Sequence, residues 1–296
     1  MPQAKPKPSE VAAQAKKIYI PYIEKMMREC PIRSYLHQNA VPLTGSPQSP
    51  LKHRLRVAIV DGDPVDVALD WYEDSVNDAT RPNPETRIPV VNMANERRAG
   101  GDWESGLMGP EECFARRSNL VHALITPWDR CGPSSLSHYP LPQKGGLYSP
   151  SVVVFRDGPD KYEIWTKFRP LPVITVAPVR RPKLDETGAQ YSFAQERELM
   201  MDKMRTVLRI AAAWKHKDVC LGAFGSGPIF RNPPREIARM WRTLLFREEE
   251  FVGRFANVVF AIEKCAPIGP EKVGLSEYEI FKEEFDPSNT HPTSYR

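Results

Sequence analysis

The sequence predicts an α/β protein: a three-layer α/β/α sandwich with a mixed central sheet and an N-terminal helical extension. Two observations lead to this class. Short apolar runs alternate with longer segments of helical periodicity, which is typical of helices packed on both faces of a sheet. The 296 residues are 41% hydrophobic and 26% charged, the composition of an ordinary globular chain long enough to bury a core.

The elements follow in order along the chain. Apolar residues at helical spacing predict a first helix over 10–30, and Asp63 followed by Pro64 predicts a helix start with Asp63 as the N-cap. Strands are expected at 57–60, 88–93, 151–155, 173–177, 219–223 and 257–262, and further helices at 64–71, 116–124, 192–216 and 234–246. We therefore expect an N-terminal helical extension and linker over 1–50, one folded domain over 51–275 and a C-terminal tail over 276–296.

Composition and charge exclude several classes of protein. The net charge of +4 mildly favours an anionic ligand but does not require nucleic acid, so no direct nucleic-acid binding is expected. The five cysteines are scattered without a CxxC pair, and the six histidines do not pair at metal-ligand spacing. We predict reduced thiols, no metal, no cofactor, a monomer, no membrane span, and a location in the cytosol or nucleus.

Two glycine-rich loops follow predicted strands, where α/β folds bind phosphates. The first is 99–103 and the second is 222–230. Gly225 and Gly227 permit positive φ and let backbone amides approach a diphosphate closely, and the helix expected from Pro234 would follow. Glycine count alone leaves a tight strand-to-helix turn without a ligand equally open.

Two adjacent carboxylates, Glu111 and Glu112, come shortly after the first loop. If a helix starts here, both lie in its first turn, where negative charge is tolerated. A carboxyl beside a bound diphosphate has its pKa raised by like charge and burial, so that it can remain protonated and donate a proton. The alternative from these residues alone is a plain acidic helix start.

The segment 91–112 resembles the signature of microbial-type poly(ADP-ribose) glycohydrolases, which combines Asn-x-Ala, a glycine cluster, a short spacer and two glutamates. The segments 139–157, 173–178 and 222–232 are similar to later parts of the same family. These matches keep their order from about residue 56 to 265, with the N-terminal helix and the tail outside the resemblance.

The resemblance implies a macro domain that binds ADP-ribose or poly(ADP-ribose) on modified proteins. Glu112 would be the catalytic acid and base, and Glu111 would help to hold the ribose hydroxyls. The expected ADP-ribose-binding residues are Asn92, Gly100, Gly101, Asp102, Gly225, Ser226, Gly227 and Phe230, with Phe230 near the adenine or its ribose. Cleavage at the ribose anomeric carbon passes through an oxocarbenium-like state, which an acid and a negative environment stabilise.

Two residues depart from the family pattern: Asp102 replaces its third glycine, and Pro110 replaces the glutamine before the glutamates. Three functions therefore stand open. The leading prediction is an ADP-ribosyl hydrolase that cleaves the ribose glycosidic or ester bond. The alternatives are a reader module that binds ADP-ribose with little or no hydrolase activity, and a hydrolase of a small ADP-ribose derivative.

Overall fold

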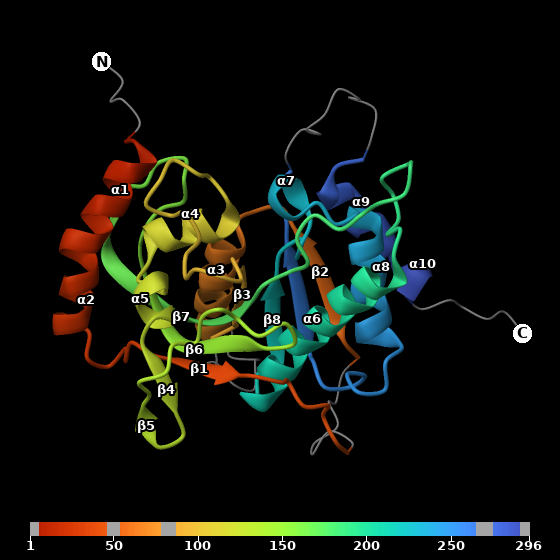
Figure 1. Ribbon diagram of the computed structural model, residues 1–296, viewed down its shortest axis with the longest axis horizontal. Helices are drawn as coiled ribbons and strands as arrows, with labels where there is room; N and C mark the ends of the chain where they lie inside the picture. The colour runs from red at the N-terminus through yellow and green to blue at the C-terminus, as the bar shows by residue number, and fades with distance from the viewer. Residues whose placement is uncertain (1–5, 46–53, 78–86, 265–274, 291–296) are drawn as a thin grey trace, which may run out of the picture. The chain divides into compact units, whose positions relative to one another are not determined.

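The computed structural model describes residues 6–45, 54–77, 87–264 and 275–290 (Figure 1). The chain forms two compact units: unit 1 contains residues 1–40 and 68–177, and unit 2 contains residues 41–67 and 178–296. Helix α3 (Pro64–Asn77) contains the boundary between them, and it starts where the sequence predicts, because Asp63 Oδ1 accepts hydrogen bonds from the amides of Val65 and Asp66. Both units combine helices with strands, so the mixed α/β class is confirmed.

Unit 1 is built around strands in the order β3-β7-β6-β1-β4-β5 (Figure 1). Their bounds are β1 (Ser34–His37), β3 (Val90–Met93), β4 (Pro127–Asp129), β5 (Gly132–Pro133), β6 (Gly146–Arg156) and β7 (Ile164–Val176). β3 runs parallel to β7, whereas β6 is antiparallel to both β7 and β1. The sequence predicts only the buried centres of β6 and β7, because their outer residues lack an apolar run.

The predicted N-terminal helix is present as three consecutive segments, α1 (Pro8–Gln14), the π-helix η1 (Ala15–Tyr19) and α2 (Ile20–Met26). It ends at Met26 rather than near residue 30. Its apolar side is buried in one cluster with Trp103, Ala115 and Phe155 of the same unit. The N-terminal helix is therefore part of the hydrophobic core of unit 1.

The prediction of one continuous helix over 116–124 is wrong. The structure has α4 (Pro110–Arg117) and α5 (Leu120–Leu124), separated by Ser118, whose backbone is extended. Ser118 forms a β-bridge with Val154, and Asn119 Oδ1 accepts a hydrogen bond from the Val153 amide at 2.7 Å. These contacts with β6 break a helix that the local pattern alone would continue.

Unit 2 contains three parallel strands in the order β2-β9-β8. They are β2 (Arg56–Val60), β8 (Asp218–Leu221) and β9 (Asn257–Ala261), and they are accompanied by α6 (Ala194–Ala213), α7 (Gly227–Phe230) and α8 (Pro234–Phe246). The core of the unit includes Trp241, which contacts the rings of Phe224 and Phe260 edge-on. Helices α6 and α8 and strand β9 lie where the periodicity of the sequence predicts them.

The stretch expected as a C-terminal tail contains two helices, α9 (Glu277–Glu284) and α10 (Pro287–Thr290). Ser276 and Glu279 form a capping box that starts α9, and Phe281 is fully buried against Phe260. This part of the stretch therefore packs on unit 2 instead of extending into solvent. Residues 291–296 lie outside the described part of the chain.

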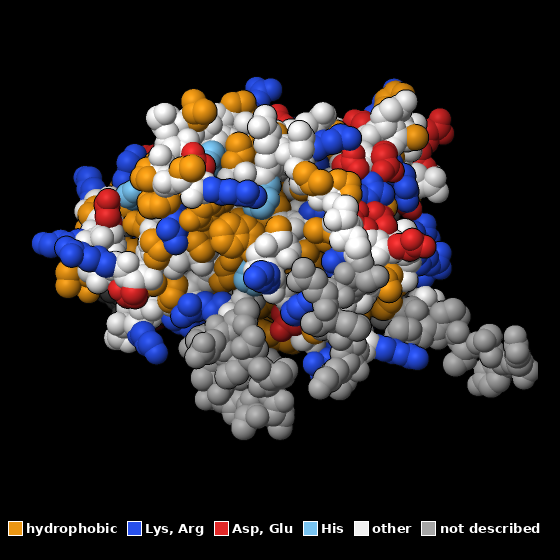
Figure 2. Space-filling view, turned by 90° about the horizontal axis from the view of Figure 1, so that it is seen from below, with side chains coloured by type: hydrophobic (Ala, Val, Ile, Leu, Met, Phe, Trp, Pro, Cys, Tyr) orange, Lys and Arg blue, Asp and Glu red, His pale blue; other side chains and the backbone are white. Residues whose placement is uncertain are grey.

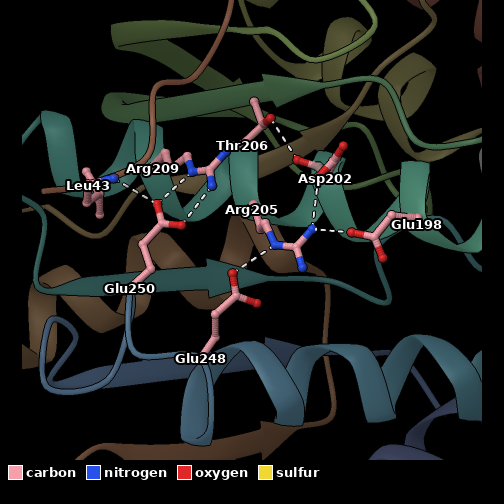
Figure 3. Close-up of polar contacts among 8 residues, drawn as sticks. All are labelled: Leu43, Glu198, Asp202, Arg205, Thr206, Arg209, Glu248 and Glu250. Carbon is pink, nitrogen blue, oxygen red and sulfur yellow. Dashed lines mark hydrogen bonds and ion pairs between the residues drawn. The ribbon is translucent and has the colours of Figure 1, made fainter.

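Ion pairs hold the segment after α8 against α6 in unit 2 (Figure 3). Arg205 contacts Glu198, Asp202 and Glu248 at 2.6, 2.9 and 2.8 Å. Arg209 contacts both oxygens of Glu250, at 2.6 and 2.7 Å. The chain after α8 is thus held to the face of α6 by charged contacts.

The surface carries charges of both signs. Figure 2 shows Lys and Arg side chains interspersed with Asp and Glu side chains and with exposed apolar atoms. This mixture agrees with the small net charge of +4. In the described ranges, no helix is both long and apolar enough to cross a bilayer.

Candidate functional site

The carboxylate pair lies where α4 begins, in unit 1. Gly109 is the extended N-cap residue and Pro110 occupies the first helical turn, a position where a backbone donor has no partner in the helix. Glu111 and Glu112 follow in this first turn and are only 3% and 6% exposed. The predicted helix start is confirmed, and it places two carboxylates in a largely buried environment.

Glu111 holds together the loop between β3 and α4. Its Oε1 accepts hydrogen bonds from the Asn92 side-chain amide at 3.3 Å and the Gly100 amide at 3.1 Å, and its Oε2 accepts one from the Asn95 amide at 2.6 Å. Burial raises the pKa of Glu111 to about 8, although these hydrogen bonds oppose the shift. The structure therefore brings Asn92 and Gly100, both expected from the sequence, onto the first carboxylate.

Glu112 lies against the glycine turn. Its Oε1 accepts a hydrogen bond from the Asp102 amide at 3.2 Å, and a Cβ on Gly101 would lie only 2.3 Å from that oxygen. Gly100 and Gly101 have φ of +75° and +56°, a region that favours glycine. Gly101 is therefore required by its backbone conformation and by the close approach of Glu112, and Gly100 by its backbone conformation and by the close approach of Val121.

The two departures from the family pattern fit this geometry. Asp102 is not among the residues with a left-handed backbone, so a Cβ there introduces no such strain. Its carboxylate forms an ion pair with the Arg98 guanidinium one turn earlier. Pro110 stands in the first turn of α4, where proline is favoured.

A third contributor is Arg116, which the sequence placed on a predicted helix but not in the site. This side chain is fully buried, and its guanidinium donates hydrogen bonds to the carbonyl oxygens of Trp103, Ser105 and Leu107 at 2.9, 2.9 and 2.6 Å. It therefore ties the turn after the glycines to the helix that carries both carboxylates. No local pattern distinguishes such an arginine from one on a solvated helix face.

Asn95 is a second residue that sequence reasoning missed, and here a signal exists. Its side-chain oxygen accepts hydrogen bonds from the amides of Arg97 and Arg98 at 2.9 and 3.2 Å. Asparagine at the start of a turn commonly forms such contacts with the backbone two or three residues later. The turn aims the Asn95 amide at Glu111.

The second glycine loop lies in unit 2, between β8 and α8. Gly225 and Gly227 have φ of +85° and +82°, as expected, and Ser226 is buried. The Asn232 side-chain amide donates to the carbonyl oxygens of Gly225 and Val179 at 2.6 and 2.7 Å, which fixes the turn. The loop does not lead directly into the helix at Pro234, because the short helix α7 comes first.

Two further residues mark this second loop. Phe230 ends α7 and is only 6% exposed, so its ring is largely covered within the described structure. Burial raises the pKa of Glu277, while hydrogen bonds from Ser226 and the Gly227 amide partly oppose that shift. A carboxylate of the chain itself therefore interacts with the amide of Gly227.

Metal chemistry has no evident location in the described ranges, since they contain no group of three or more His, Cys, Asp or Glu side chains placed to hold an ion. Cys30, Cys113, Cys131 and Cys220 are free thiols. Cys265 lies outside the described residues.

Comparisons with known proteins agree with these features. Residues 12–157 match the family described as microbial-type PARG, catalytic domain. Because the match begins at residue 12, it includes most of the N-terminal helix, and the expectation that this helix lies outside the resemblance is wrong. None of the curated proteins compared with the chain matches it.

The chain is also similar to solved structures. Poly(ADP-ribose) glycohydrolase from Thermomonospora curvata is 20% identical, with a TM-score of 0.66 over 94% of this chain and 99% of that chain. The same glycohydrolase bound to the inhibitor ADP-HPD is 25% identical, with a TM-score of 0.59 over 78% and 79%. The enzyme from Deinococcus radiodurans in complex with ADP-ribose is 23% identical, with a TM-score of 0.57 over 78% and 84%.

Proposed function

Residues 12–157 belong to the microbial-type PARG catalytic-domain family, and from this premise we propose that the protein is an ADP-ribosyl hydrolase. It binds ADP-ribose and cleaves the ribose glycosidic or ester bond that joins it to a polymer or a protein. One observation carries the proposal: the buried carboxylate of Glu112 lies against the side-chain-free surface of Gly101. Such a turn lets a sugar approach a proton donor closely.

We assign the proton transfers to Glu112. Its protonated carboxyl gives a proton to the departing oxygen as the bond from that oxygen to the anomeric carbon breaks. A water then adds to the anomeric carbon and returns a proton to the Glu112 carboxylate, so the residue ends as it began. Positive charge develops on the ribose in the oxocarbenium-like state, and the Glu112 carboxylate left after proton donation stabilises it.

Glu111 has a different environment and therefore a different proposed role. Both of its oxygens already accept hydrogen bonds from the protein, namely from Asn92, Asn95 and Gly100. We propose that it chiefly sets the position of the glycine turn, and that any contact with ribose hydroxyls uses its remaining lone pairs. Asn92 then acts through Glu111, whereas Gly101 and Asp102 line the approach to Glu112.

The loop over 222–230 is the proposed diphosphate-binding element. Its two glycines have positive φ, with Ser226 between them, and the Gly227 amide already hydrogen-bonds a carboxylate of the chain, Glu277. Backbone amides in such turns attract anions. Phe230 remains the proposed neighbour of the adenine or its ribose, and only the 6% of this residue that is exposed is open to such a contact.

The hydrolase is favoured over the reader module because both sequence departures are accommodated. Arg98 pairs with the Asp102 carboxylate, and Pro110 fits the first turn of α4. We further propose the three-layer macro-domain arrangement, the 51–275 domain, a monomer, and a location in the cytosol or nucleus. The substrate is poly(ADP-ribose) or ADP-ribose on a modified protein, and water is the acceptor.

The experiment uses the full chain and an automodified poly(ADP-ribosyl)ated protein. Free ADP-ribose is measured over time, and binding of ADP-ribose is measured by calorimetry. We expect the wild type to bind and to release ADP-ribose, and Glu112→Gln to bind while losing at least about 100-fold of the rate, the lower range for a lost general acid. Glu104→Gln, an exposed glutamate of the same loop, is the matched control.

The outcomes separate the candidates. Binding without release by the wild type would establish the reader module instead. Absence of calorimetric binding would overturn both functions. Release that is unchanged in Glu112→Gln would show that the catalytic assignment is wrong.

A further inference from the structure

A tyrosine hydroxyl beside the carboxylate site has no role in the chemistry described above. Tyr139 lies in the segment between β5 and β6, and its amide donates to Ser137 Oγ at 3.1 Å. Two residues later, the Leu141 amide donates to the Glu96 carbonyl oxygen at 2.8 Å. The segment is thereby fastened to the turn whose Asn95 amide contacts Glu111.

The hydroxyl of Tyr139 is buried although the residue as a whole is partly exposed. Within the described part of the chain it has no hydrogen-bond partner. Burying a hydroxyl without a partner is unfavourable, and most buried polar groups in folded proteins are satisfied. An orphaned hydroxyl next to a candidate site is therefore a group whose partner is expected to be the ligand.

The protonation state of this hydroxyl follows from its burial and from the charge of Glu111. Burial raises the pKa of Tyr139, and the charge of Glu111 raises it further. The hydroxyl therefore stays protonated at neutral pH and remains a hydrogen-bond donor. Glu111 itself is already occupied by three protein donors, so it does not account for the free donor of Tyr139.

We propose that the Tyr139 hydroxyl is a further ligand-contacting group of the Glu111–Glu112 site, where it donates a hydrogen bond to an oxygen of the bound ADP-ribose. This inference rests on the proposed function. Tyr139 supplies a hydroxyl donor beside two carboxyl groups that already accept hydrogen bonds from backbone amides. The hydrogen bond from Leu141 to Glu96 fixes the position of the Tyr139 segment relative to the turn that contacts Glu111.

The decisive variant is Tyr139→Phe, which removes one oxygen and keeps the ring. If the Tyr139 hydroxyl does not contact the ligand, Tyr139→Phe should have unchanged or higher thermal stability and should bind ADP-ribose as the wild type does. A ligand-contacting hydroxyl predicts unchanged or higher stability together with weaker binding. We expect the dissociation constant for ADP-ribose to rise about tenfold, as for one lost hydrogen bond to a ligand.

The matched control is Tyr162→Phe. Its hydroxyl is also buried, and the pKa of this tyrosine is raised by burial and by Cys113, with no contribution from Glu111. We expect this variant to bind ADP-ribose as the wild type does. Calorimetry with ADP-ribose and thermal unfolding are measured for all three proteins.

The results distinguish a failure of this inference from a failure of the proposed function. Unchanged affinity of Tyr139→Phe, in a protein whose wild type binds ADP-ribose, would overturn this inference and leave the proposed function intact. Wild type that does not bind ADP-ribose would overturn both. An equal loss of affinity in both tyrosine variants would also reject the assignment, because it would not be specific to the hydroxyl near Glu111.

Discussion

Gly101 and Glu112 occupy neighbouring space that a side chain on the glycine would close. A Cβ on Gly101 would lie 2.3 Å from Glu112 Oε1 and 3.4 Å from Glu111 Oε2. Real Cβ atoms do not approach oxygen at the first of these distances. The glycine is therefore a condition for the position of the proposed catalytic carboxylate, apart from its own backbone conformation.

The first prediction follows from this contact. Gly101→Ala is expected to displace the Glu112 carboxylate and to lower the rate of ADP-ribose release on the order of 100-fold, the effect of a shift of about an ångström. The matched control is Gly106→Ala, because a Cβ on Gly106 would have no heavy atom within 4 Å. Equal rates for Gly101→Ala and the wild type would contradict the proposed geometry.

The second prediction concerns Arg116, which holds three carbonyl oxygens of the turn. Arg116→Lys keeps the charge but loses the planar fork, so at least one carbonyl is left unpaired. We expect a loss of about 1–3 kcal/mol in the free energy of unfolding, and a fall in kcat larger than the change in KM. Urea denaturation and steady-state release measure the two effects, with the exposed Arg97→Lys as the control.

The third prediction concerns pH. The pKa of Glu111 is about 8 in the folded protein against 4.5 for an unperturbed glutamate, so folding retains a proton that the unfolded chain loses. The contribution of protonated Glu111 to the free energy of unfolding is therefore largest below about pH 4.5, and it declines as the pH rises to about 8. The stability of the wild type relative to Glu111→Gln should therefore fall between about pH 5 and about pH 8.

Urea denaturation of both proteins across this range is the measurement. The pKa of His216, lowered to about 4 by burial, changes stability equally in both and cancels in the difference. A constant difference between the two proteins would mean that Glu111 is ionised throughout.

The fourth prediction concerns the ion pairs on α6 (Figure 3). Glu250 is partly buried, which favours protonation, but hydrogen bonds from Arg209 and the Leu43 amide hold its pKa below the usual value. Its contribution to stability is present above the ordinary glutamate pKa and is lost as the pH falls. Glu250→Gln should therefore cost about 2 kcal/mol of unfolding free energy at neutral pH and less in acid.

Chemical denaturation at neutral and acidic pH measures that difference. Glu249→Gln is the adjacent control, because Glu249 is exposed. A cost for Glu250→Gln that does not shrink in acid would exclude the ionised carboxylate as its source.

The fifth prediction concerns Arg98 and Asp102. Arg98→Ala would leave the Asp102 carboxylate without its cation, and repulsion between that carboxylate and the anionic ligand should weaken binding of ADP-ribose. The pair is exposed, with side chains 64% and 46% accessible, so the change should be no more than about fivefold. Adding Asp102→Gly should restore affinity, and calorimetry of the double variant tests this; no restoration would point to a direct contact of Arg98 with the ligand.

Local chemistry made much of the site predictable. Pro110 and the glutamates mark a helix start, and Gly100, Gly101, Gly225 and Gly227 mark turns with positive φ, because these preferences depend on the residue and its immediate neighbours. The buried parts of six strands were likewise visible as apolar runs, whereas the short strands β1, β4 and β5 were not predicted. The boundaries of β6 and the break at Ser118 were not, since both depend on pairing with distant strands.

The sequence by itself determined the alternation of strands and helices, the two glycine turns and the adjacent carboxylates. Only the tertiary structure decided that Asn92 and Asn95 meet Glu111, that Arg116 turns inward to three carbonyls, and that Tyr139 buries its hydroxyl near the same carboxylate. The reason is physical. A propensity acts over a few neighbouring residues, whereas the partner of a buried polar group is chosen by which distant segments the packed core brings together.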